Sequence, residues 1–104
     1  MNERDWKIFE AIKNDALNRY SEVAIKEFQK ILSEADFTSN KKHGALYIAI
    51  NDYDRVLGRL FDGHSRSRAN SQLAGLRANQ LTSDELVKRL SQEIQDQTEP
   101  RAFG

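Results

Sequence analysis

The sequence predicts an all-α protein: a long antiparallel helical hairpin with one shorter helix packed across it. Apolar residues recur at steps of three or four over most of the chain, and this spacing is typical of amphipathic helices. Proline occurs once and glycine five times, so little interrupts the helices. With 104 residues the chain fits one domain. We expect this domain to cover residues 1–96 and the remaining residues, 97–104, to form a disordered tail.

The first helix is expected over about residues 3–35. Its apolar stripe keeps helical spacing from one end to the other. The members of the stripe are Phe9, Ile12, Ala16, Tyr20, Ala24, Phe28, Ile31 and Ala35. The opposite side carries acids placed four residues before bases, such as Glu22 before Lys26, which is the favourable order in a helix. At about 1.5 Å per residue, this helix is expected to be about 50 Å long.

A second helix is expected from about residue 43 onward, after the turn-forming segment "DFTSNKKHG" of residues 36–44. Its apolar stripe is formed by Leu46, Ile50, Tyr53, Leu57, Leu60 and Phe61. The segment "ALYIAI", residues 45–50, is apolar nearly all round, which indicates burial on several sides or a contact with another molecule. A short apolar run of this kind also suits a β-strand, but the stripe that continues to Phe61 favours a helix.

The stretch "FDGHSRSRANS", residues 61–71, allows two interpretations of the chain beyond Phe61. In the first, Asp62 and Gly63 end the helix and Ser65 caps a new one. In the second, one helix continues to about residue 78, kinked near Gly63, while its apolar face rotates by about 100°. Both interpretations account for the later apolar residues, which are Ala69, Leu73 and Leu76.

Length favours the continuous or kinked helix over about residues 43–78. A first helix that is apolar along its whole length needs a hairpin partner of similar length. A second helix that ends near Gly63 leaves the start of the first helix, including Trp6 and Phe9, to be covered by later segments.

The segment "LRANQLTSDEL" predicts a turn and then a third helix over about residues 83–95. Asn79 can adopt the left-handed conformation that ends a helix, and Thr82 with Glu85 has the spacing of a capping box. The apolar residues that then recur on one side are Leu86, Leu90 and Ile94.

Several classes of function lack the residues that they need. Cysteine is absent, which excludes disulfides, thiolate nucleophiles and zinc–thiolate sites. The two histidines, His43 and His64, do not have the spacing of a helical metal site. Phosphate-binding glycine loops, nucleophile elbows and dinucleotide fingerprints are also missing. We therefore expect no catalytic activity, no metal and no cofactor.

The distribution of apolar residues also bears on location. The first residues mix charges with apolar side chains, which excludes the apolar core of a secretory signal. The longest unbroken apolar run, residues 45–50, is too short to span a bilayer. We expect a cytoplasmic protein with no membrane contact.

Sixteen basic and sixteen acidic residues cancel, so any electrostatic site is local. Residues 63–81 contain no acid but carry Arg66, Arg68 and Arg77. Such a group suits nucleic-acid phosphates or an acidic protein partner. It equally suits ion pairs with acids at the start of the first helix. These acids are Glu3, Asp5 and Glu10.

A hairpin with one short third helix has little interior for the large aromatic residues of this chain. These include Trp6, Tyr20, Phe28, Phe37, Tyr47 and Tyr53. The imbalance predicts burial by a second chain, in a homodimer or in a complex with another protein. We expect a small interaction protein, an adaptor or inhibitor; the alternative is a nucleic-acid-associated regulator that uses the arginines. The candidate partner-binding residues are His64, Arg66, Arg68, Arg77, Tyr47 and Trp6.

Overall fold

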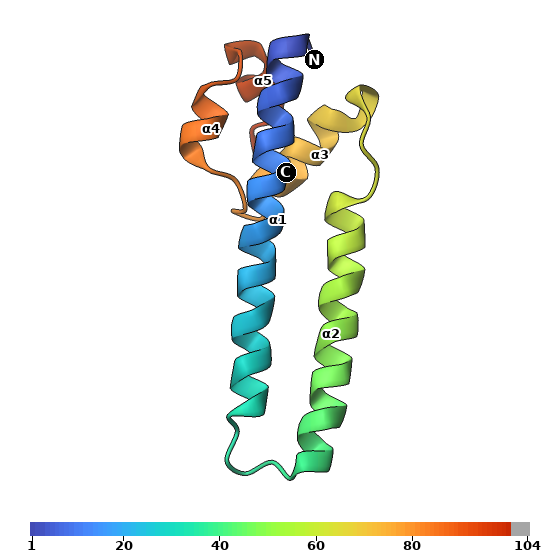
Figure 1. Cartoon of the computed structure of the whole chain (residues 1–104). Helices are drawn as coiled ribbons and strands as arrows, with labels where there is room; N and C mark the ends of the chain where they lie inside the picture. The colour runs from blue at the N-terminus through green and yellow to red at the C-terminus, as the bar shows by residue number, and fades with distance from the viewer. Residues whose placement is uncertain (101–104) are drawn as a thin grey trace.

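The protein is an all-α structure of five helices within residues 1–100, which are the residues that the computed structural model describes. These helices are α1 (Glu3–Leu32), α2 (Ser39–Phe61), α3 (Arg66–Ala78), α4 (Asp84–Lys88) and α5 (Gln92–Gln97). α1 and α2 form an antiparallel hairpin, and the later helices pack around the N-terminal half of α1 (Figure 1). The predicted all-α class and hairpin are confirmed. The molecule is elongated, with extents of 53 × 25 × 23 Å.

Side-chain caps fix where the two hairpin helices begin. The Asn2 side-chain oxygen accepts a hydrogen bond from the Asp5 backbone N–H at 2.8 Å, which starts α1. The Thr38 hydroxyl accepts from the Lys41 N–H at 3.2 Å, which starts α2 at Ser39, earlier than predicted. α1 ends at Leu32, also earlier than predicted, so the turn covers residues 33–38 and part of the expected polar turn segment forms the first turn of α2.

The predicted continuous helix over about residues 43–78 is wrong, and the alternative with a break at Gly63 is confirmed. α2 ends at Phe61 and α3 begins at Arg66. Gly63 has φ +81°, in the left-handed region that favours glycine and that a right-handed helix does not contain.

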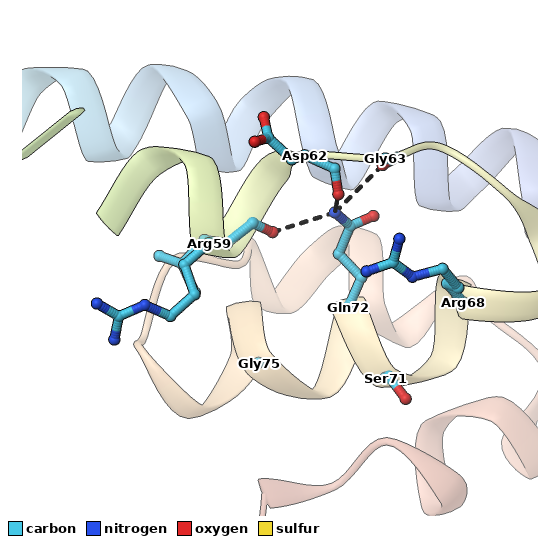
Figure 2. Close-up of a pocket in the computed structure, with 8 residues that line it drawn as sticks. Arg59, Asp62, Gly63, Arg68, Ser71, Gln72 and Gly75 are labelled. Atoms are coloured by element: carbon cyan, nitrogen blue, oxygen red, sulfur yellow. Dashed lines mark hydrogen bonds between the residues drawn. The ribbon is translucent and has the colours of Figure 1, made fainter. Parts of the chain in front are cut away.

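Two side chains from other helices hold this break in place. The Gln72 amide on α3 donates to three backbone oxygens, those of Leu60, Asp62 and Gly63, at 3.1, 3.3 and 3.4 Å (Figure 2). The Lys13 ammonium on α1 donates to the Gly63 oxygen at 2.6 Å. These bonds satisfy carbonyl groups that have no helical partner at the end of α2.

The break lets later segments cover the start of α1. Phe9 and Ile12 are fully buried there. The buried residues packed with them are Ala69, Leu73, Val87, Leu90 and Ile94. α2 does not need to match the length of α1, because three short helices cover the part of α1 that α2 does not reach.

The predicted third helix over about residues 83–95 is divided into α4 and α5. Between them, Ser91 donates its backbone N–H and its hydroxyl to the two carboxylate oxygens of Asp5, each at 2.8 Å. Asp5 is 1% exposed, and these two hydrogen bonds satisfy its buried carboxylate. Because Asp5 takes the Ser91 N–H, the helix does not run through this point and restarts at Gln92.

The first part of the predicted tail packs against the helices. Gln97 is the last residue of α5, and Thr98 is fully buried. The Thr98 hydroxyl donates to the Ile94 oxygen at 2.7 Å and accepts from the Arg77 guanidinium at 2.9 Å. The end of the predicted tail, residues 101–104, lies outside the described residues.

A second buried cluster joins the hairpin to α3. It consists of Ala16, Tyr20, Leu76 and Leu81. The Tyr20 hydroxyl donates to the Tyr53 backbone oxygen of α2 at 2.9 Å. Burial raises the pKa of Tyr20, so this hydroxyl keeps its proton at neutral pH. No residue of α2 is buried, although the whole of α2 is described.

Gly63→Ala is expected to destabilise the protein by about 1 kcal/mol or more, because a side chain at φ +81° is strained. Gly75→Ala is the matched control. Gly75 lies inside α3 with open space where a methyl group would go, so this change should stabilise by about 0.5–1 kcal/mol. Chemical denaturation measures both effects. Stabilisation by both substitutions would contradict the role of Gly63 in the break.

Asp5→Ala should lower the free energy of unfolding by about 2–3 kcal/mol, because it removes a buried carboxylate that accepts two hydrogen bonds from Ser91. Glu85→Ala is the control. Its side chain is 78% exposed and, within residues 1–100, pairs only with Arg89, so its effect should stay below about 0.5 kcal/mol. Thermal unfolding followed by circular dichroism compares the two. Equal Tm values would show that the bonds to Ser91 do not stabilise the fold.

Candidate interaction surfaces

Three of the predicted partner-binding residues meet at the start of α1. The His64 ring lies against the Trp6 ring, with centroids 4.5 Å apart. The Arg66 guanidinium lies 5.4 Å from the centre of the Trp6 ring. Arg66 also forms an ion pair with Glu3, one of the acids expected to lie nearby. Trp6, His64 and Arg66 therefore share one surface, and Glu3 offsets its positive charge.

Lys13 extends this surface toward the break, although no sequence pattern indicated it. Its ammonium lies 3.4 Å from the His64 ring nitrogen Nδ1, in addition to its bond with Gly63. Burial lowers the pKa of Lys13, and the nearby Asp62 carboxylate opposes this shift. Lys13 thus links α1 to the loop between α2 and α3.

Arg77 contacts the chain itself. Its guanidinium donates to the Gln95 backbone oxygen at 2.7 Å and to the Thr98 hydroxyl at 2.9 Å. Both bonds connect α3 to the region of α5. These contacts leave the Arg77 side chain little freedom to bind another molecule.

Arg68 lines a polar cavity of about 180 Å³ beside the break (Figure 2). The other lining residues are Arg59, Leu60, Asp62, Gly63, Ser71, Gln72 and Gly75. The Arg68 guanidinium makes no hydrogen bond or ion pair with any residue in 1–100. In Figure 2 the guanidinium of Arg59 points away from that of Arg68, and the Gln72 amide faces backbone oxygens. The charged groups of this cavity therefore do not converge on one point.

The structure does not bring the three predicted arginines together. Arg66 lies against the start of α1, Arg68 lies beside the break, and Arg77 lies against the α5 region. Arg66 and Arg68 are two residues apart on one helix, so their side chains point in different directions although they are close in the sequence.

The hairpin arm, residues 21–54, extends beyond the two buried clusters (Figure 1). Six large apolar side chains of this fully described segment are exposed. Their exposed fractions are 52% for Val23, Ile25 and Leu32, 68% for Tyr47, 61% for Ile48 and 47% for Ile50. Tyr47 is the predicted partner-binding residue of this region, and it lies apart from the other five predicted partner-binding residues. An exposed apolar surface of this kind is typical of an interaction site.

A groove of about 270 Å³ lies between the two helices on one side of the arm. Its lining residues are Tyr20, Ser21, Ala24, Ile25 and Phe28 of α1, and Ile50, Tyr53, Asp54 and Leu57 of α2. We call this side the groove face. Ile25 and Ile50 lie on it, whereas Val23 and Ile48, each two residues away, point to other sides of their helices.

Arg77→Ala and Arg66→Ala distinguish a structural arginine from an exposed one. Arg77→Ala should destabilise the protein by about 1–2 kcal/mol, because it removes two hydrogen bonds from a charged donor in a partly buried position. Arg66→Ala should change the free energy of unfolding by less than about 1 kcal/mol, because its ion pair with Glu3 is exposed. Urea denaturation measures both; a larger loss for Arg66→Ala would contradict this assignment.

Neither a metal site nor a membrane span is found among the described residues. Within residues 1–100, no group of three acidic or histidine side chains gathers closely enough to hold a metal ion. None of the described helices has the length and apolar composition needed to cross a bilayer. No family model, curated protein or solved structure matches this chain.

Proposed function

We propose that this protein is a small cytoplasmic protein–protein interaction module, an adaptor or inhibitor without catalytic activity, that acts through the apolar surface of the hairpin arm. The contrast between the two halves of α1 carries this proposal. Phe9 and Ile12 in the first half are fully buried, whereas Ile25 and Leu32 in the second half are 52% exposed. Such a helix gains stability when another molecule covers its exposed apolar half.

The size of the molecular surface supports the same proposal. A compact domain of 104 residues has a radius of gyration of about 13 Å, whereas the value here is 16.7 Å. A compact chain of 12.0 kDa exposes about 6000 Å², whereas this protein exposes 6998 Å². The excess of about 1000 Å² is similar to the roughly 800 Å² that one partner contributes to a standard interface.

A nucleic-acid-associated regulator that uses Arg66, Arg68 and Arg77 is the alternative. The separate positions of these arginines favour the interaction module, because phosphate binding needs several cations along one surface. Salt distinguishes the two functions. Contacts to phosphates weaken steeply with ionic strength, and contacts through an apolar face do not.

A photoreactive amino acid in place of Ile25 is expected to cross-link the arm to a protein in the native cytoplasm, because a partner covers this side chain in our proposal. The same amino acid in place of Glu85 on α4 is the control, since its side chain is 78% exposed and lies outside the arm. Mass spectrometry after irradiation compares the two sets of adducts. Adducts at position 85 with none at position 25 would contradict the proposed function.

A further inference from the structure

We infer that the groove face packs against the groove face of a second copy of this chain, with the two arms antiparallel. This inference rests on the proposed function, that the arm is an interaction surface, and it names the partner. Two hairpins joined in this way form a four-helix bundle, an arrangement that buries the apolar stripes of paired helices.

A self-complementary stripe along α2 is the first observation in favour of a second copy. His43, Tyr47, Ile50, Asp54 and Leu57 follow one another at alternating steps of four and three, so they lie on one side of the helix. The last three of them line the groove, which places the stripe on the groove face. Apolar side chains occupy the middle of the stripe, with an imidazole at one end and a carboxylate toward the other.

The order of these residues fits an antiparallel pair. About a two-fold axis, residues equally far on either side of the axis meet. When Tyr47 of one copy meets Ile50 of the other, His43 meets Asp54 in the same register. Each of these contacts occurs twice. Two parallel α2 helices side by side would instead place Asp54 against Asp54, which is repulsive.

The exposed residues of α1 have the same symmetry. Ile25 and Leu32 are both 52% exposed and lie equally far from the point midway between Phe28 and Gln29. In the antiparallel pair, Ile25 of one copy meets Leu32 of the other. Ile25 and Phe28 share the groove with Ile50, so the point midway between Ile25 and Leu32 lies at a level of the arm similar to the point midway between Tyr47 and Ile50. One two-fold axis therefore serves both helices.

His43 and Asp54 have no hydrogen-bond or ion-pair partner within the described chain. Neither side chain forms a hydrogen bond or an ion pair with any residue in 1–100. The neighbouring Asp52 differs, because it pairs with Arg55 at 3.8 Å. A carboxylate that lines an apolar groove gains from a hydrogen-bond donor, and the antiparallel register supplies an imidazole to each copy.

Sedimentation equilibrium of the full chain tests the dimer. The wild type is expected to be a dimer that dissociates on dilution. Ile25→Lys and Ile50→Lys should each weaken the dimer by about tenfold or more, because each introduces a charge into the interface twice. Val23→Lys and Ile48→Lys are the matched controls: they change similarly exposed residues outside the groove face and should leave the affinity within about twofold. Circular dichroism checks that all four variants fold.

An exchange of charges tests the register. Asp54→Lys and His43→Asp should each weaken the dimer by about threefold to tenfold, because each removes the pairing or places like charges together. The double variant should recover most of the wild-type affinity, since it places a carboxylate and an ammonium opposite each other across the interface. Additive weakening in the double variant would overturn the proposed register.

The absence of cysteine from the chain allows a direct test of direction. A mixture of Tyr47→Cys chains and Ile50→Cys chains should form a mixed disulfide dimer on mild oxidation. Asn40→Cys chains should stay monomeric under the same conditions in denaturing gels, because the antiparallel register keeps the two tips about 25 Å apart. Cross-linking of Asn40→Cys chains without cross-linking of the mixture would overturn the antiparallel arrangement.

Two further outcomes separate this inference from the proposed function. A wild type that stays monomeric up to high micromolar concentration would overturn the second copy as partner, and the proposed function would stand if Ile25 still cross-links a different protein. Equal loss of the dimer in Ile48→Lys and Ile50→Lys would overturn the groove face as the interface.

Discussion

The break at Gly63 is the feature on which the rest of the structure depends. A glycine at φ +81° turns the chain out of α2. The Gln72 amide and the Lys13 ammonium bind the backbone oxygens that this turn leaves without helical partners. The chain then returns along the first half of α1, where α3, α4 and α5 help to bury Phe9 and Ile12. Without the break, the same residues would lengthen α2, and α2 itself would lie along the start of α1 in place of the later short helices.

This arrangement gives the two halves of α1 different surroundings. Around the first half, polar groups that enter the interior are satisfied, as the bonds from Ser91 to Asp5 and from Arg77 to Thr98 show. In the arm, α1 and α2 pack only against each other. The apolar surface of each helix is wider than the area that one neighbouring helix covers, so side chains such as Ile25 stay exposed. A chain of this size has too little interior to bury both halves equally. In our proposal, a partner for the arm resolves this shortage.

Most of the fold was predictable because apolar spacing in a helix persists whatever the helix packs against. The choice between a continuous helix and a break at Gly63 was not predictable, because both interpretations give the later residues the same spacing and differ only in what covers Phe9. Hydrogen bonds between residues far apart in the sequence could not be predicted either. The bond from the Ser91 N–H to Asp5 divides the last helical segment into two helices. The segment 45–50 was expected to be buried on several sides or to contact another molecule, and in the structure Tyr47, Ile48 and Ile50 are exposed. Ile25 was missed, since it lies outside the stripe of α1 and joins the groove only in three dimensions.

Hydrogen exchange followed by mass spectrometry over a range of protein concentrations tests this division of the molecule most directly. We predict that amides of α3 and of the first half of α1 exchange slowly at every concentration, because their helices share the buried core. Amides of residues 45–54 should exchange quickly in dilute solution and become protected when a second molecule covers the arm. Equal protection of both regions at every concentration would show that the arm is complete by itself and would contradict its role as an interaction surface.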